Sequence, residues 1–456
     1  MTASESFRKR FTKKNLLETY EKRIQGNGAV GLDKVNNTSF HKYLSENINT
    51  INRKVNNNSY RFTTYKQKLI SKGADSKPRQ LSIPTFRDRL TLRCLCDLFF
   101  DVYSSEIKSE IPQVKIHSIC QEINSGVFDG YVKIDIKRFY SSIDHVRLEA
   151  VLNKKIFKQE VRSLIRKAIK NGTTASPIKG TIYTNLDGIP QGLSISNILA
   201  EIFMLDFDLS LSAMSTIKYV RYVDDILILC KEEDAEIIGQ SVIRMLGSKG
   251  LEAHPLVEDS KSEFGNLSDE FSFLGYLFSN YKTTVGFGSK HRFESSLVRL
   301  LTTYKYKLLS AKNSDEKIKS LRILEWRLNL RITGCIFDGT KRGWMFYYSQ
   351  ISDLTVLHKL DITVKKLLCR FDLEGKLQIK SLVKTYFEAQ QRDVESSKYI
   401  INFDNLTKEE KIEILNKYLG AKYQLIHKTE DEINRLFEMR IGRVIKELEE
   451  DLQDLS

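Results

Sequence analysis

The sequence has few of the residues that cross-link small extracellular proteins or separate domains along a chain. Its 456 residues include only 6 Cys and 6 Pro. The cysteines are scattered, without CxxC pairs or nearby His clusters, which argues against a disulfide framework and a zinc module and predicts reduced thiols in a cytoplasmic protein. No stretch approaches 18 uncharged apolar residues, so we expect no membrane segment. Without Pro-rich or Gly/Ser-rich linkers, the parts of the chain are expected to be packed subdomains.

Basic residues outnumber acidic ones. The chain has 72 Lys and Arg against 58 Asp and Glu, which gives a formal net charge of +14. Such a balance suits a polyanionic partner held through phosphate contacts, although solvated lysines on helix surfaces would give the same total. The 41% hydrophobic content permits a substantial core, divided among two or three subdomains.

The patterning of apolar residues changes along the chain. Residues 1–60 are helical in pattern, and a short extended stretch at 77–84 precedes a helix from about 87 to 100. Short β runs alternate with helices from 130 to 280, and the remainder is mostly helical, with capping boxes at Thr407 and Thr429. This order predicts an α+β fold.

Two adjacent aspartates stand where two β runs meet. The run at 217–230 is typical of a hairpin whose turn carries Asp224 and Asp225. Neighbouring carboxylates are costly to ionise together unless divalent cations bind between them, although Asp-Asp also occurs in ordinary polar turns. Asp135 stands inside another apolar run, where a lone carboxylate is expensive to bury. If the two segments are neighbours, the three carboxylates supply a pocket for two Mg²⁺ ions.

Several motifs resemble, in order and spacing, those of reverse transcriptases. They are Asp135 with Tyr140, the run Gly188 to Gly192, and the run Tyr222 to Asp225. The resemblance extends over about residues 20–350, and its N-terminal part is similar to the group II intron and related bacterial enzymes. It implies a right-hand polymerase with these parts: N-terminal extension and fingers at 1–130, palm at 131–285 with a fingers insertion near 146–187, helical thumb at 286–385, and helical C-terminal extension at 386–456.

The resemblance also implies roles around the metals. Asp135, Ile136, Asp224 and Asp225 would bind two Mg²⁺ ions, with Mn²⁺ as an alternative. Tyr140 would stack under the incoming sugar and clash with a 2′-hydroxyl, which makes dNTPs the expected substrates. Phe139 beside it could take this role, or Tyr140 could be an aromatic core residue.

Further matched residues would handle the nucleotide and the primer. Lys77 and Arg79 would grip the triphosphate from a flexible loop, and Gln191 would hydrogen-bond to sugar or base between glycines that let the backbone approach the nucleotide. Lys261 would donate a proton to the departing pyrophosphate, although a surface lysine fits as well. The remaining match is a primer grip formed by Phe273, Leu274, Gly275 and Tyr276.

The motifs separate the subgroups of this family poorly. We find no carboxylate set of an RNase H, no HNH-type cluster and no Asn-Ala-x-x-His ahead of Asp135, which disfavours a complete intron-mobility protein and a retron enzyme. The chain looks most like the defence-associated (antiviral) reverse transcriptases. Its expected partners are an RNA template, with a dedicated noncoding RNA as one option, a DNA product, dNTPs, and an accessory defence protein or a second copy of the chain. A retron or group II intron-type enzyme or maturase, and untemplated or protein-primed synthesis, remain alternatives.

Overall fold

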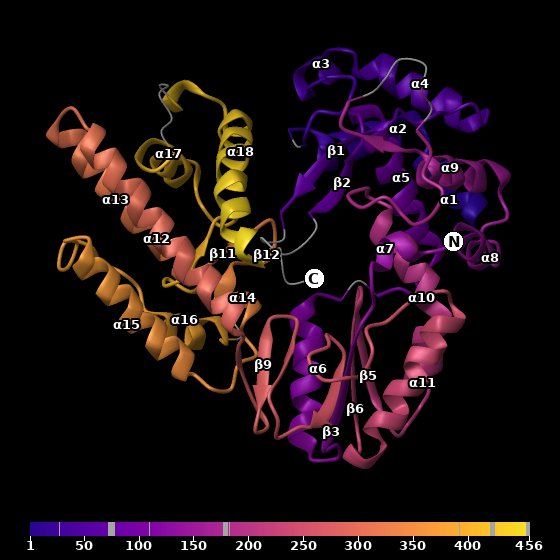
Figure 1. The fold of residues 1–456 in the computed structure, drawn as a ribbon. Coiled ribbons are helices and arrows are strands. Elements are labelled where there is room, and N and C mark those ends of the chain that lie inside the picture. Colours follow the sequence, from indigo (N-terminus) through magenta and orange to yellow (C-terminus); the bar gives the residue numbers. More distant parts are fainter. Residues whose placement is uncertain are drawn as a thin grey trace. The chain divides into compact units, whose positions relative to one another are not determined.

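A computed structural model describes residues 1–26, 28–71, 78–108, 110–176, 181, 183–391, 393–419 and 425–452. The chain forms two compact units, each from two segments of sequence (Figure 1). The first unit comprises residues 1–109 and 131–264, and the second comprises residues 110–130 and 265–456. Within the described residues, no helix is long and apolar enough to cross a membrane.

Helices make up most of the first unit. In chain order they are α1 (Ala3–Arg10), α2 (Lys13–Thr19), α3 (Asn37–Lys42), α4 (Leu44–Asn56), α5 (Phe86–Val102), α7 (Phe139–Ser142), α8 (His145–Leu152), α9 (Gln159–Lys170), α10 (Ser196–Ser212) and α11 (Ala235–Ser248). A short π-helix, Tyr20–Ile24, follows α2. Many of their apolar faces meet in one core, to which α5 contributes the fully buried side chains of Leu90, Leu95 and Phe99.

Two small sheets accompany these helices. The first has the order β2-β1-β4 and contains β1 (Tyr65–Ile70), β2 (Arg79–Ile83) and β4 (Thr173–Thr174). The second has the order β5-β6-β3-β7 and contains β3 (Gly130–Asp135), β5 (Lys218–Tyr222), β6 (Asp225–Cys230) and β7 (Glu263–Asn266). Helix α10 packs against β5 of the second sheet (Figure 1).

The second unit combines long helices with two three-stranded sheets. Its helices are α6 (Pro112–Ser125), α12 (Phe287–Ser310), α13 (Ser314–Thr333), α14 (Trp344–Tyr347), α15 (Thr355–Arg370), α16 (Leu382–Ala389), α17 (Lys408–Lys417) and α18 (Glu430–Glu449). Its strands are β8 (Phe271–Phe273), β9 (Tyr276–Ser279), β10 (Lys282–Val285), β11 (Cys335–Phe337), β12 (Thr340–Arg342) and β13 (Ile401–Asn402). They form sheets of order β10-β9-β8 and β12-β11-β13.

The predicted α+β class is confirmed by this mixture of helices with sheets that are largely antiparallel, apart from the parallel pairs β1–β4 and β11–β13. Both capping boxes are present: Thr407 and Thr429 each accept a hydrogen bond from the backbone three residues on, at the starts of α17 and α18. The helix expected near 146–170 is wrong, because α8 and α9 are separate helices that end and begin on either side of residues 153–158. Residues 334–343, where glycines interrupt the mostly helical pattern, contain a β-hairpin, β11–β12, that the pattern did not predict.

Candidate active site

The second sheet of the first unit brings the three predicted aspartates together. Asp135 ends β3, Asp225 begins the adjacent strand β6, and Asp224 lies in the turn that precedes it. The backbone N–H of Ile136 donates to the carbonyl of Asp224 at 3.3 Å, which links the end of β3 directly to the turn. The side chain of Ile136 is buried.

The turn between β5 and β6 has an unusual backbone. Tyr222 pairs with Asp225, so the turn consists of Val223 and Asp224 alone. Val223 adopts a φ of +58°, a left-handed conformation that is a genuine outlier for a β-branched residue. Such conformations persist only where the surrounding structure enforces them, and they cluster at functional sites.

Negative charge is crowded at this turn. Burial and, after it, the charges of Asp224 and Asp135 raise the pKa of Asp225, while Lys133 and Lys261 act in the opposite direction, and the net result is a pKa of about 7. Lys261 therefore lies within electrostatic range of Asp225, with its own side chain exposed. A hard divalent cation bound between such carboxylates would neutralise the repulsion between their negative charges.

The same carboxylates do not already form a coordination sphere. Among the residues that the structure describes, no group of three or more His, Cys, Asp or Glu side chains is arranged to hold a metal ion. The donor set thus fits Mg²⁺ or Mn²⁺ by its chemistry, and rotation of the half-buried carboxylates would be needed to converge on an ion.

His254 is a neighbour of Asp135 that the sequence pattern did not identify. Its Nε2 lies 3.3 Å from Oδ1 of Asp135, and its backbone N–H donates to the Asp135 carbonyl at 3.0 Å. The backbone N–H of Asp135 in turn donates to Oγ of Ser262 at 3.1 Å. An antiparallel bridge between Ile136 and Ala253 creates this arrangement, and local sequence around His254 carries no signal for it.

Three of the predicted nucleotide-binding residues, Arg79, Tyr140 and Gln191, lie near one another. Nε of Arg79 donates to Oε1 of Gln191 at 2.7 Å. Burial raises the pKa of Tyr140, as do the charges of Asp224 and Glu201, and Arg79 lowers it, so these groups lie within electrostatic range of one another. The hydroxyl of Tyr140, a residue only 6% exposed, donates to Oδ1 of Asn197 at 2.8 Å.

Arg79 and Lys77 differ from expectation. Arg79 was predicted to lie on a flexible loop, but it is the first residue of β2 and pairs with Ile70 of β1. The antiparallel pairing of the two strands extends as far as Arg79, so this residue belongs to the sheet. Lys77 lies outside the described residues. Phe139, the alternative to Tyr140, is 2% exposed and packs against the Tyr140 ring.

The loop from Gly188 to Gly192 is fixed by the protein itself. Gly188 has a φ of +75°, and a Cβ there would lie 2.5 Å from Cα of Ser141. Gly192 has a φ of +96°, and a Cβ would lie 3.1 Å from the carbonyl oxygen of Ser82. The structure shows that these glycines make room for neighbouring backbone, in a loop where Gln191 meets Arg79, and the close approach of this loop to a nucleotide stays a prediction.

The four predicted primer-grip residues form a tight turn in the second unit. Phe273 pairs with Tyr276 across a two-residue turn in which Leu274 and Gly275 have φ values of +48° and +77°. The side chains of Phe273, Leu274 and Tyr276 are buried. The hydroxyl of Tyr347 donates to the Leu274 carbonyl at 3.0 Å. The turn is therefore held in place by strand pairing and by hydrogen bonds to the carbonyls of Leu274 and Gly275.

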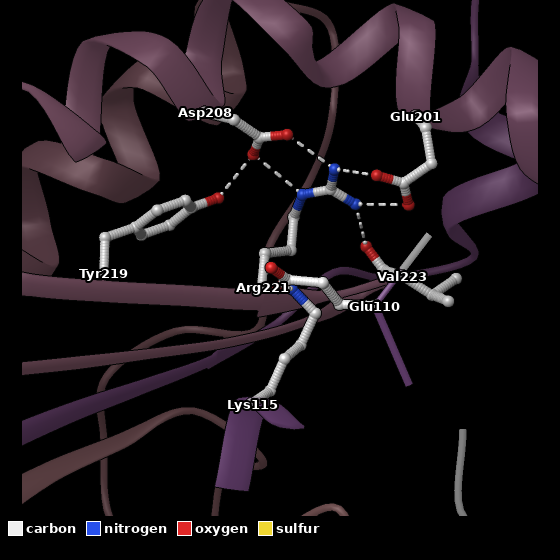
Figure 2. Close-up of polar contacts among 7 residues, drawn as sticks. All are labelled: Glu110, Lys115, Glu201, Asp208, Tyr219, Arg221 and Val223. Carbon is white, nitrogen blue, oxygen red and sulfur yellow. Dashed lines mark hydrogen bonds and ion pairs between the residues drawn. The ribbon is translucent and has the colours of Figure 1, made fainter. Parts of the chain in front are cut away.

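The sequence also did not predict an ion-pair network around a buried arginine, Arg221. Arg221 of β5 is surrounded by Glu201 and Asp208 of α10, and Tyr219 donates to Asp208 at 2.6 Å (Figure 2). A charged residue within a predicted strand could have indicated a buried ion pair, because Arg221 is buried in β5. Its partners could not be identified in the same way, because they belong to another element.

Comparison with known proteins places these residues in a recognised segment. Residues 70–278 match the family model described as reverse transcriptase (RNA-dependent DNA polymerase). All of the predicted site residues fall within that segment.

Curated relatives are similar at low identity. The chain is 27% identical over 172 residues to the group II intron-encoded protein LtrA of Lactococcus lactis, which covers 36% of this chain and 28% of the relative. It is 31% identical over 169 residues to an uncharacterised 91 kDa protein in the cob intron of Schizosaccharomyces pombe, which covers 35% of this chain and 20% of the relative. The chain thus matches less than a third of either relative's length.

Among solved structures, telomerase of Candida albicans aligns with a TM-score of 0.40 at 13% identity, over 79% of this chain and 66% of that one. Apo telomerase of Candida tropicalis aligns with a TM-score of 0.39 at 15% identity, over 49% and 55%. Both scores are below 0.5, so this likeness adds nothing to what the site geometry and the family match support.

Proposed function

We propose that this protein is an RNA-directed DNA polymerase that extends a nucleic-acid 3′ end with dNTPs, with Asp135, Asp224 and Asp225 as ligands of two divalent cations. The observation that carries the proposal is that the three aspartates lie together, at the adjoining ends of β3 and β6 and in the turn before β6, within a segment that matches the reverse transcriptase family. Two bound Mg²⁺ ions would stabilise charge on the attacking 3′ oxygen and on the departing pyrophosphate.

We propose separate roles for the residues around the carboxylates in triphosphate binding, sugar selection and protonation of pyrophosphate. Arg79 is proposed to bind the triphosphate, because a guanidinium presents several donors in a fixed plane, and Gln191 holds that guanidinium through its 2.7 Å hydrogen bond. Tyr140 is proposed to select the sugar, since its hydroxyl is fixed by Asn197 and its ring is nearly buried. Lys261, exposed near Asp225, is proposed to protonate pyrophosphate.

The larger parts are proposed by resemblance. We assign fingers to residues 1–130, palm to 131–285, thumb to 286–385 and a helical extension to 386–456. The net charge of +14 supports a nucleic-acid partner. Template RNA and a role of the DNA product in antiviral defence in the cytoplasm are parts of this proposal, and they rest on the similarity of the motifs to the defence-associated enzymes.

The deciding experiment is primer extension with purified protein, an RNA template, dNTPs and Mg²⁺. Asp224→Asn should abolish extension while the protein remains folded by circular dichroism. Asp206→Asn is the matched control, because it removes an exposed aspartate of α10 that pairs with Lys154 on the surface. Extension by Asp224→Asn at the wild-type rate would refute the assignment of the carboxylates.

Sequencing the product separates templated from untemplated synthesis. A DNA complementary to the supplied RNA supports the proposal. A homopolymer or random tract, or a product covalently attached to the protein, would replace the templated reaction by untemplated or protein-primed synthesis at the same carboxylates.

A further inference from the structure

The guanidinium of Arg221 uses every one of its N–H groups. Nε and Nη2 donate to Asp208 at 2.8 and 2.6 Å, and Nη2 and Nη1 donate to Glu201 at 2.6 and 3.1 Å. The second Nη1 donor reaches the carbonyl of Val223 at 2.9 Å (Figure 2). An arginine has five N–H donors in a rigid fork, so this site is saturated. The side chain is 4% exposed.

The contact with Val223 matters because of where that residue lies. Val223 is the strained residue of the two-residue turn, and the next residue is Asp224. Hydrogen bonds from charged donors are stronger than those from neutral ones, so the bond to the Val223 carbonyl stabilises the turn against the strain of its left-handed β-branched residue. Arg221 therefore offsets the strain and fixes the direction in which Asp224 leaves the turn.

The network connects the turn to one face of α10. Glu201 and Asp208 are seven residues apart, two helical turns, and Asn197 lies one turn before Glu201. Asn197 holds the hydroxyl of Tyr140. The same helical face thus anchors the carboxylate turn through Arg221 and the proposed sugar selector through Asn197.

Arg221 also balances charge beside the site. The negative charge of Glu201 reaches far enough to raise the pKa of both Tyr140 and Tyr222, after the larger effect of burial. Without the guanidinium, the carboxylates of Glu201 and Asp208 would lose their cationic partner beside the turn that carries Asp224. Lysine could not replace it fully, because an ammonium is a point charge with three donors.

We propose that Arg221 is a positioning residue that holds the Val223–Asp224 turn against α10 and thereby sets the affinity of the carboxylates for divalent metal. This inference rests on the proposed function and adds a determinant outside the metal ligands. Outer partners of metal ligands typically change metal affinity or activity by about 10–100-fold when they are replaced.

The test compares Arg221→Lys with Arg166→Lys. Arg166 donates two hydrogen bonds of 2.8 Å to Glu149 in the same unit, and its side chain is half-exposed. It is a suitable control because this arginine–carboxylate pair does not involve the carbonyl of a turn. We expect Arg221→Lys to weaken Mn²⁺ binding by the protein alone, followed by electron paramagnetic resonance, at least about tenfold. The Mg²⁺ concentration for half-maximal extension should rise by the same factor, with kcat approaching wild type at saturating Mg²⁺. Arg166→Lys should change neither value.

Wild-type Mn²⁺ affinity in folded Arg221→Lys would overturn the inference. If Arg221→Lys does not fold, Glu201→Gln decides, because it removes one of the two carboxylates that hold the guanidinium and so loosens the contact of Arg221 with the Val223 carbonyl. Asp206→Asn is its control, because it removes a negative charge from the same helix without touching Arg221. Weaker Mn²⁺ binding by Glu201→Gln would support the inference, and unchanged binding would overturn it. A wild-type protein that neither binds Mn²⁺ nor extends primers would instead refute the proposed function itself.

Discussion

Replacing Asp225 by Asn should stabilise the metal-free protein. Asp225 is the carboxylate on which burial and the charges of Asp224 and Asp135 act together, and its pKa of about 7 lies well above the ordinary 3.8. An amide of the same shape removes the repelled charge and keeps the packing. The variant should therefore gain stability while it loses a proposed metal ligand, a combination expected of residues selected for function.

The size and the pH range of the effect follow from the two pKa values. A group whose pKa is raised in the folded state contributes most stability below its unfolded pKa, near 4, and loses that contribution as the pH rises through about 7. The full difference corresponds to about 4 kcal/mol at 1.36 kcal/mol per pH unit. Because Asp225 keeps partial contact with solvent, we expect about 2–4 kcal/mol at pH 8.

The assay is thermal unfolding in EDTA at a series of pH values from 5 to 8. In a unit of this size, 2–4 kcal/mol corresponds to an increase in Tm of the order of 5–10 °C at pH 8. The advantage of Asp225→Asn over wild type should shrink as the pH is lowered toward 5. Adding Mg²⁺ at pH 8 should raise the Tm of wild type more than that of the variant, because only wild type keeps all three carboxylates.

An equal or lower Tm for Asp225→Asn at pH 8, or parallel pH dependences for the two proteins, would refute the view that the three carboxylates crowd one another. Asp206→Asn is the control, since Asp206 is an exposed surface residue and its replacement should leave the pH dependence unchanged.

Three other predictions concern the surroundings of the site. Tyr140→Ala should admit ribonucleotides, measured as the ratio of kcat/KM for rNTP and dNTP, and an unchanged ratio would shift attention to Phe139. Arg79→Ala should raise the KM for dNTP at least about tenfold through loss of a charge-assisted contact, with primer binding retained in a filter assay; an unchanged KM would remove Arg79 from the triphosphate site. Gly188→Ala should lower stability by about 1–3 kcal/mol, because its φ is +75° and its Cβ would lie 2.5 Å from Ser141. Gly247→Ala, in a helix with open space around it, should be neutral or stabilising by urea unfolding, and equal effects of the two changes would contradict the packing argument.

The sequence alone predicted the features that depend on near neighbours in the chain. The hairpin at 217–230 followed from two β runs that flank a polar pair, and it is present as β5 and β6. The helix starts at Thr407 and Thr429 followed from capping boxes, which need only four consecutive residues. The candidate site residues were identified because the order and spacing of the motifs resemble those of reverse transcriptases.

Local pattern was insufficient where packing decided the outcome. One helix was predicted across 146–170, whereas the structure has two, α8 and α9, with a break between them. The short strands β11 and β12 were not predicted, because they lie in a region whose composition is mostly that of helices. Strands of three residues carry too few alternating positions to be distinguished from a loop or a helix end.

Only the tertiary structure decided which of the candidate residues meet. Arg79 and Gln191 are 112 residues apart in the chain, and their hydrogen bond depends on β2 lying against the Gly188–Gly192 loop. His254 reaches Asp135 through a single bridge, and Arg221 finds Glu201 and Asp208 because α10 packs on β5. Strand pairing and helix packing are contacts between residues far apart in the chain, and they depend on the burial of whole apolar faces. The periodicity of a segment indicates which of its faces is buried. It does not indicate which other segment covers that face.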